Sequence, residues 1–191
     1  MAKGLYPTLC FALMGAAVPA FAQSSHITEN LTAFQTTLNG QPLRIARSGP
    51  VCPPSCVTPM QAASGVATVG ELEVLDFLEL FVSEGRGLLV DARLPEAFST
   101  GTVPGAVNVP ASTLAPENPY RDDLLEALGV RSGDFSGAFD LVLFAGGADD
   151  GLAAAAVRNL LDAGYPPTKL KFYRGGLKAW DGLGLSLAAG Q

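Results

Sequence analysis

The stretch that decides the fold is FDLVLFAGGADDGLAAAAVRNLLDAGY, residues 139–165. The apolar run DLVLFA is typical of a buried strand, and LAAAAVRNLLDAG predicts a helix that ends at Gly164. The glycine-rich residues 145–151 between them predict a tight loop. Because ligands of parallel sheets bind beyond the carboxyl ends of the strands, residues 145–151 mark the candidate site.

Strands and helices alternate on both sides of this unit. Three more strands are predicted in GLLVDAR (87–93), AVNVP (106–110) and KLKFYRGG (169–176), and four more helices in 68–85, 94–101, 121–130 and 177–184. In the helix over 68–85, Thr68 is the expected N-cap. Its buried face is expected to carry Leu72, Leu75, Leu78 and Phe81. The sequence therefore predicts an α/β fold, a parallel sheet with helices on both faces.

The first residues resemble a secretory signal peptide. Lys3 is followed by an apolar segment of about ten residues and by the small-residue site Ala20-Phe21-Ala22. Residues 1–22 are therefore the expected signal peptide, and Gln23 the first residue of the mature chain. The expected location is the periplasm, with no membrane segment after cleavage.

Residues 23–64 form the expected N-terminal extension before a main domain at 65–188. Asn39-Gly40 lies between two short apolar segments and predicts a hairpin, which we expect to pack on the main domain. The CPPSC linker follows. It contains Cys52 and Cys56, an even pair that forms a disulfide candidate in an oxidising compartment.

Charge and motifs exclude several functions. The 191 residues carry a net charge of -6 with only 12 Lys and Arg, so a nucleic-acid partner is not expected. The sequence contains no phosphate loop, zinc motif, dinucleotide fingerprint or nucleophile elbow. We therefore expect no cofactor and no metal among the site residues.

Two segments, read in this order, resemble the rhodanese-like domain family. They are LLVDARLPEAFSTGTVPGAVNVP (88–110) and GYPPTKLKFYRGGLKAWDGLGLSL (164–187), and the resemblance covers about 65–188. It implies a rhodanese-like parallel sheet preceded by the short hairpin and linker extension. In active members a cysteine after the central strand accepts sulfur as a persulfide within a ring of backbone N–H groups.

This chain departs from the family at that loop. The cysteine position maps to Ala145, and the usual Arg and Ser positions map to Asp150 and Gly151. The resemblance therefore implies a catalytically degenerate loop, consisting of Ala145, Gly146, Gly147, Ala148, Asp149, Asp150 and Gly151. The two aspartates either accept hydrogen bonds from the amides of the helix N-terminus or form a site for a cation.

Two other residue pairs are candidates for chemistry. Asp91 and Arg93 are expected to form a structural hydrogen-bonded pair at a strand end. For Cys52 and Cys56 the sequence leaves four alternatives open. The pair is a structural disulfide, a redox-active disulfide, a copper(I) thiolate site or a sulfur-transfer site.

The sequence supports two principal functional hypotheses. The first is an exported, inactive binding or accessory module in a periplasmic sulfur, redox or metal-related process, with an unknown protein partner or small ligand at residues 145–151. The alternative is a thiol sulfurtransferase or redox protein that acts through Cys52 or Cys56. A phosphatase is a third hypothesis, weakened because it needs the same missing loop cysteine. The position of the linker relative to the loop discriminates between the first two.

Overall fold

The computed structural model describes residues 33–46 and 58–191. The predicted signal peptide 1–22, Cys52 and Cys56 therefore lie outside the described residues. Among the residues that are described, no helix is long and apolar enough to cross a membrane.

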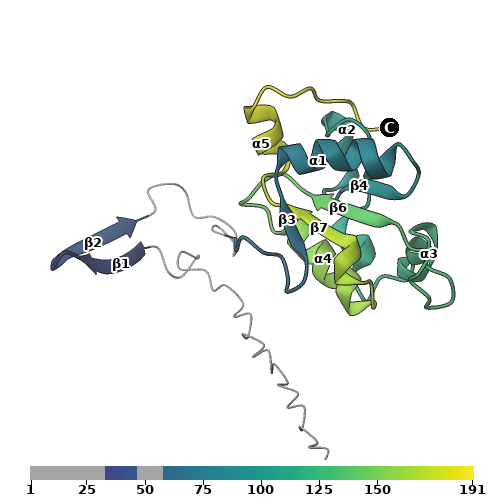
Figure 1. Ribbon diagram of the computed structural model, residues 1–191, viewed down its shortest axis with the longest axis horizontal. Coiled ribbons are helices and arrows are strands. Elements are labelled where there is room, and N and C mark those ends of the chain that lie inside the picture. Colours follow the sequence, from purple (N-terminus) through teal and green to yellow (C-terminus); the bar gives the residue numbers. More distant parts are fainter. Residues whose placement is uncertain (1–32, 47–57) are drawn as a thin grey trace, which may run out of the picture.

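The main domain is built on a five-stranded parallel sheet (Figure 1). Its strands are β3 (Ala67–Val69), β4 (Gly87–Asp91), β5 (Ala106–Asn108), β6 (Asp140–Phe144) and β7 (Leu170–Tyr173), in the spatial order β3-β7-β6-β4-β5. The apolar run DLVLFA occupies the central strand β6, as its continuous hydrophobicity predicts. There Leu143 is paired with Val90 on one side and with Phe172 on the other.

Helices cover both faces of the sheet, which confirms the predicted fold class. They are α1 (Glu71–Phe77), α2 (Pro95–Thr100), α3 (Arg121–Ala127), α4 (Leu152–Asp162) and α5 (Gly176–Gly182), with short helical turns at Leu78–Val82, Ala111–Leu114 and Pro167–Lys169. In Figure 1, α1, α2 and α5 lie above the sheet, and α3 and α4 lie below it.

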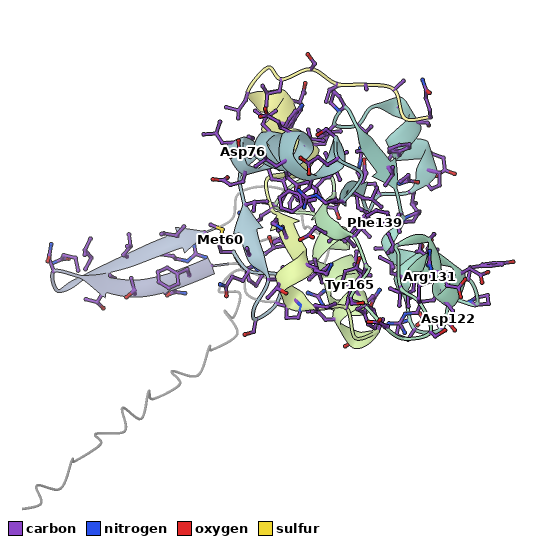
Figure 2. All side chains as sticks on the ribbon, turned by 45° about the vertical axis from the view of Figure 1, so that its right-hand side comes forward. Met60, Asp76, Asp122, Arg131, Phe139 and Tyr165 are labelled. Atoms are coloured by element: carbon purple, nitrogen blue, oxygen red, sulfur yellow. The ribbon has the colours of Figure 1, made fainter. Side chains whose placement is uncertain are left out.

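Successive residues of β6 point into two separate cores. Leu141 and Leu143 pack with α4, whereas Val142 and Phe144 pack with α1 and α5. The α4 side also contains Tyr165, which donates a hydrogen bond to the Phe139 carbonyl at 2.6 Å (Figure 2). This alternation is the strand period of two, so burial on both faces accounts for the uninterrupted apolar run.

The predicted buried face of the first helix is partly wrong. Leu72 and Leu75 are 73% and 42% exposed, whereas Val74 and Phe77 are buried. The α-helix ends at Phe77 and continues as a π-helical turn, Leu78–Val82. The predicted stripe repeats every three residues, whereas one helical turn contains about 3.6 residues, so the stripe drifts around the helix by about 60° per step and places Leu72 opposite Phe81. The buried face instead carries Val74 and Phe77, with Leu78 and Phe81 partly buried.

The predicted N-cap of that helix is also wrong. Thr68 lies in β3, a strand that the sequence analysis did not predict, and its hydroxyl donates to the Met60 carbonyl at 2.7 Å. The helix begins after Gly70, whose N–H donates to the Glu73 carboxylate at 2.9 Å. A strand of three residues is too short to show an alternating pattern.

The predicted hairpin forms as β1 (Ala33–Leu38) and β2 (Gln41–Ala46). Its turn residues Asn39 and Gly40 have φ of 51° and 75°, as a two-residue hairpin turn of this type requires. The expected packing on the main domain is wrong. All six β2 residues are exposed, and the hairpin lies apart from the five-stranded sheet in Figure 1.

Candidate functional site

The loop of residues 145–151, called the site loop below, follows the central strand at the carboxyl edge of the sheet. Ala145 is buried, and its carbonyl accepts a hydrogen bond from the Leu177 N–H at 2.9 Å. The Gly146 carbonyl accepts one from the Lys178 N–H, also at 2.9 Å. The first turn of α5 therefore holds the start of the site loop.

Gly176 makes this contact feasible. Its φ is +58°, and a β-carbon there would lie 2.8 Å from the Gly147 nitrogen and closer still to the Ala145 carbonyl oxygen. Only glycine fits both the backbone conformation and the space. Gly176, which lies in the segment 164–187 that resembles the family, therefore shapes the site loop from the start of α5.

The Asp150 carboxylate occupies the interior of the site loop. One oxygen accepts from the Gly146 N–H at 3.0 Å, and the other accepts from the Leu152 N–H at 2.9 Å. Leu152 is the first residue of α4, so its amide belongs to the positive end of the helix dipole. The chain thus supplies its own anion to amides that could otherwise bind an external anion.

Asp149 points to a different partner. Its carboxylate lies 2.6 Å from the Lys178 ammonium, and both side chains are more than half exposed. The hydrogen bond from Lys178 lowers the pKa of Asp149 below its ordinary value, against a smaller opposing effect of burial. The two adjacent aspartates are therefore engaged separately, one by a lysine and one by backbone amides.

Asp91 and Arg93 lie together at the carboxyl end of β4. The Arg93 Nη2 atom is 2.6 Å from the Asp91 carboxylate, and the Thr102 hydroxyl donates to the same carboxylate at 2.8 Å. Arg93 also donates to the Gly101 carbonyl at 2.6 Å. Asp91 is fully buried, so its charge is compensated by a buried network that ties β4 to the segment after α2.

A cavity of about 220 Å³ borders the site loop; we call it the site cavity. Its lining consists of Arg93, Gly146, Leu177, Lys178, Asp181 and Leu187. Leu187 comes from the C-terminal tail, where Ala188 exchanges two backbone hydrogen bonds with Thr102. The site cavity therefore combines cations, one carboxylate and two apolar walls, and it draws on four parts of the chain: the end of β4, the site loop, α5 and the C-terminal tail.

The end of the CPPSC linker contacts the site loop. The Thr58 hydroxyl donates to the Ala148 carbonyl, and the Thr58 carbonyl accepts from the Arg174 guanidinium at 2.8 Å. The Pro59 carbonyl accepts from the same guanidinium at 3.1 Å. The chain thus enters the main domain beside the site loop, although Cys52 and Cys56 themselves lie outside the described residues.

The described part of the chain contains no group of three or more His, Cys, Asp or Glu residues arranged to hold a metal ion. The sequence analysis missed several residues that surround the site, namely Thr58, Lys178, Asp181 and Leu187. Lys178 had a usable signal, because it follows a predicted parallel strand closely and so belongs to the same sheet edge as the site loop. Leu187 had no such signal in the sequence, because its position at the cavity depends on the course of the C-terminal tail after α5.

The fold and the site loop define a parallel α/β domain with a strand–loop–helix site at its centre. The family model of the rhodanese-like domain matches residues 75–183, which is more than half of the chain. The chain belongs to the rhodanese-like domain family, as its two sequence segments predicted. No match was found among curated proteins.

Solved structures resemble this chain at low sequence identity. A protein from Bacillus halodurans is 15% identical with a TM-score of 0.50, over 64% of this chain and 77% of its own. Thiosulfate sulfurtransferase from Pseudomonas aeruginosa is 21% identical with a TM-score of 0.47, over 69% of this chain and 22% of its own. The human single-domain sulfurtransferase is 26% identical with a TM-score of 0.44, over 61% and 96%. The first of these likenesses shows the fold.

Proposed function

We propose that this chain is an exported, catalytically inactive rhodanese-like module that binds a protein partner or small ligand beside the site loop. The observation that carries the proposal is the Asp150 carboxylate, which accepts hydrogen bonds from the Gly146 amide of the site loop and from the Leu152 amide of α4. The residue at the nucleophile position is Ala145, and a methyl group cannot hold a sulfane sulfur. Export to the periplasm rests on the predicted signal peptide at 1–22.

The same carboxylate opposes anionic sulfur donors. Two like charges about 4 Å apart repel by about 1 kcal/mol in water, and by about 4 kcal/mol at an effective dielectric constant of about 20. Thiosulfate at the loop amides would have to displace Asp150 or approach it. A ligand is better accommodated in the site cavity, where Arg93, Lys178 and Asp181 offer charges of both signs beside apolar walls.

The absence of sulfur transfer is tested with the mature protein, thiosulfate and cyanide. We expect no thiocyanate above the level of a Cys52→Ser/Cys56→Ser variant. Thiocyanate production by that variant itself would contradict the proposal, because it would require transfer by a chain without its two linker thiols.

Binding at the site cavity is tested by retention of a periplasmic partner on immobilised mature protein. Leu187→Arg places a charged side chain in the cavity lining, and Leu183→Arg is the matched control, because Leu183 is exposed but does not line the cavity. A partner should be retained by wild type and by the control and lost by Leu187→Arg. Equal retention by both variants would contradict binding at this cavity.

A second candidate function is sulfur transfer or redox chemistry through a linker thiol. The contact between Thr58 and Ala148 supports this second function. Cys56 precedes Thr58 by two residues, and two residues span at most about 7 Å, so the chain length allows its thiol to reach the site loop. In this case thiocyanate would form with wild type and be lost in Cys56→Ser. Turnover unaffected by that substitution would exclude a role for Cys56.

A further inference from the structure

The two outer edges of the hairpin differ in their ability to pair with another strand. In an antiparallel pair, residues whose N–H and C=O groups point inward alternate with residues whose groups point outward. Leu38 and Gln41 flank the two-residue turn and form the first inward pair, as in other hairpins of this type. By alternation, Ala33, Gln35 and Thr37 present their backbone groups on the outer edge of β1.

The outer edge of β2 is protected against pairing. Its outward residues are Pro42, Arg44 and Ala46, the cross-strand partners of the outward residues of β1. Pro42 has no N–H to donate, and Arg44 adds a charge. Proline and basic residues are two devices by which proteins block the edges of sheets.

The outer edge of β1 carries none of these devices. Ala33–Leu38 contains no charged residue and no proline, and Gln35 to Leu38 are exposed. Within the described part of the chain, this sheet has only the two strands β1 and β2. A long uncharged edge strand of this kind is a template for another strand.

The hairpin also has an exposed apolar face. Leu38, Leu43 and Ile45 are 59%, 37% and 50% exposed, and the register places all three on the same side of the two strands. A two-stranded hairpin is only marginally stable alone, so this one requires an additional strand or a packing partner. The edges of the main sheet are poor acceptors, because β3 and β5 have three residues each.

We propose that β1 pairs antiparallel with β1 of a second copy of this chain. With the two-fold axis at Gln35, Ala33 faces Thr37 of the second copy, and every outward residue of β1 meets an outward residue. The pairing is isologous and closed, and an uncharged strand opposes itself without repulsion. The product is a four-stranded sheet whose outer edges are both β2 with its Pro42, and the apolar residues of the two copies lie on one face.

The proposal is tested by the molar mass of the mature chain in light scattering, at protein concentrations spanning the micromolar range. The Cys52→Ser/Cys56→Ser background prevents an intermolecular disulfide from producing the dimer. Wild type in this background should have twice the monomer mass. Thr37→Pro should be monomeric, because it removes an outward N–H that the hairpin itself does not use. Pro42→Thr alters the opposite edge and should remain dimeric.

A charge swap at the two-fold axis identifies the strand. Gln35→Lys and Gln35→Glu each place like charges opposite one another in the dimer and should raise its Kd about fivefold. An equimolar mixture of the two variants should recover at least the wild-type affinity through heterodimers, which shows that both variants still fold. A monomeric wild type, a dimer unaffected by Thr37→Pro, or a mixture that fails to recover would overturn the proposal.

Discussion

The charge of Asp150 should govern the acidity of a thiol placed at residue 145. The test protein carries Ala145→Cys in the Cys52→Ser/Cys56→Ser background, so the loop thiol is the only one in the mature chain. Asp150→Asn is then added. This change removes the negative charge, and its amide oxygen can still accept the hydrogen bond from the Gly146 N–H.

The magnitude follows from the position of the carboxylate. It lies 3.0 Å from the Gly146 nitrogen, the atom that follows residue 145 along the backbone. A sulfur on the β-carbon of residue 145 is therefore about 5 Å from the carboxylate. At that distance the repulsion between thiolate and carboxylate is about 0.8 kcal/mol in water and about 3 kcal/mol at an effective dielectric constant of about 20. Asp150→Asn should lower the thiol pKa by about 0.6 to 2.4.

The pH dependence of alkylation by iodoacetamide measures the thiol pKa in each variant. Asp149→Asn is the matched control, because the Asp149 carboxylate is exposed and lies against Lys178 instead of the loop amides. Its removal should change the thiol pKa by less than about 0.3, since solvent and salt screen exposed charges. An equal effect of the two substitutions would refute the assignment of Asp150 as the internal anion of the site loop.

Two further predictions concern stability. Burial raises the pKa of Tyr165 above its ordinary value of 10.0, so the folded chain keeps the phenol proton at a pH where the unfolded chain releases it. The contribution of Tyr165 to the free energy of unfolding is complete below pH 10 and decreases above it by up to about 1.4 kcal/mol per pH unit. In urea unfolding between about pH 9 and 11, the free energy of unfolding should therefore depend less on pH in Tyr165→Phe than in wild type. Tyr120→Phe is the control and should leave this pH dependence unchanged, since Tyr120 is exposed. Gly176→Ala should destabilise the domain by about 2 to 4 kcal/mol in urea titrations, because Gly176 has a positive φ and its added β-carbon would collide with the Ala145 carbonyl oxygen. Gly182→Ala is the control and should be neutral or stabilising, because its added β-carbon would have no neighbour within contact distance. Equal unfolding midpoints for the two glycine variants would contradict this account.

The fold was predictable wherever a pattern repeats over enough residues. The sequence predicted β6 as a strand and α4 as a helix, because the buried strand and the eleven-residue helix each repeat their hydrophobic pattern several times. The three residues of β3 contain no complete pattern, and the strand exists because Thr68 and its neighbours pair with β7. The assignment of Leu72 to the buried face failed because a strict spacing of three residues drifts around an α-helix, whereas Val74 and Phe77 follow the face that packs on the sheet.

The site was predictable in position but not in its contacts. Parallel topology alone predicted that residues 145–151 lie at the carboxyl edge of the sheet, and there they follow the central strand β6. Adjacent aspartates in a sequence carry no information about which one faces the loop amides, and only the backbone path separates Asp150 from Asp149. Thr58 and Leu187 reach the site from an irregular linker and a tail, segments whose course local periodicity does not determine.

The structure also explains how the site loop keeps its shape with alanine at residue 145. An empty anion site leaves amide donors without protein partners, which is costly wherever water is excluded. Here the Asp150 carboxylate accepts from the Gly146 and Leu152 amides, and α5 donates to the Ala145 and Gly146 carbonyls. None of these bonds involves a side chain at residue 145, so the loop conformation does not depend on a cysteine there. A ligand that uses the loop amides must first displace Asp150, which is why we propose recognition by the side chains of the site cavity.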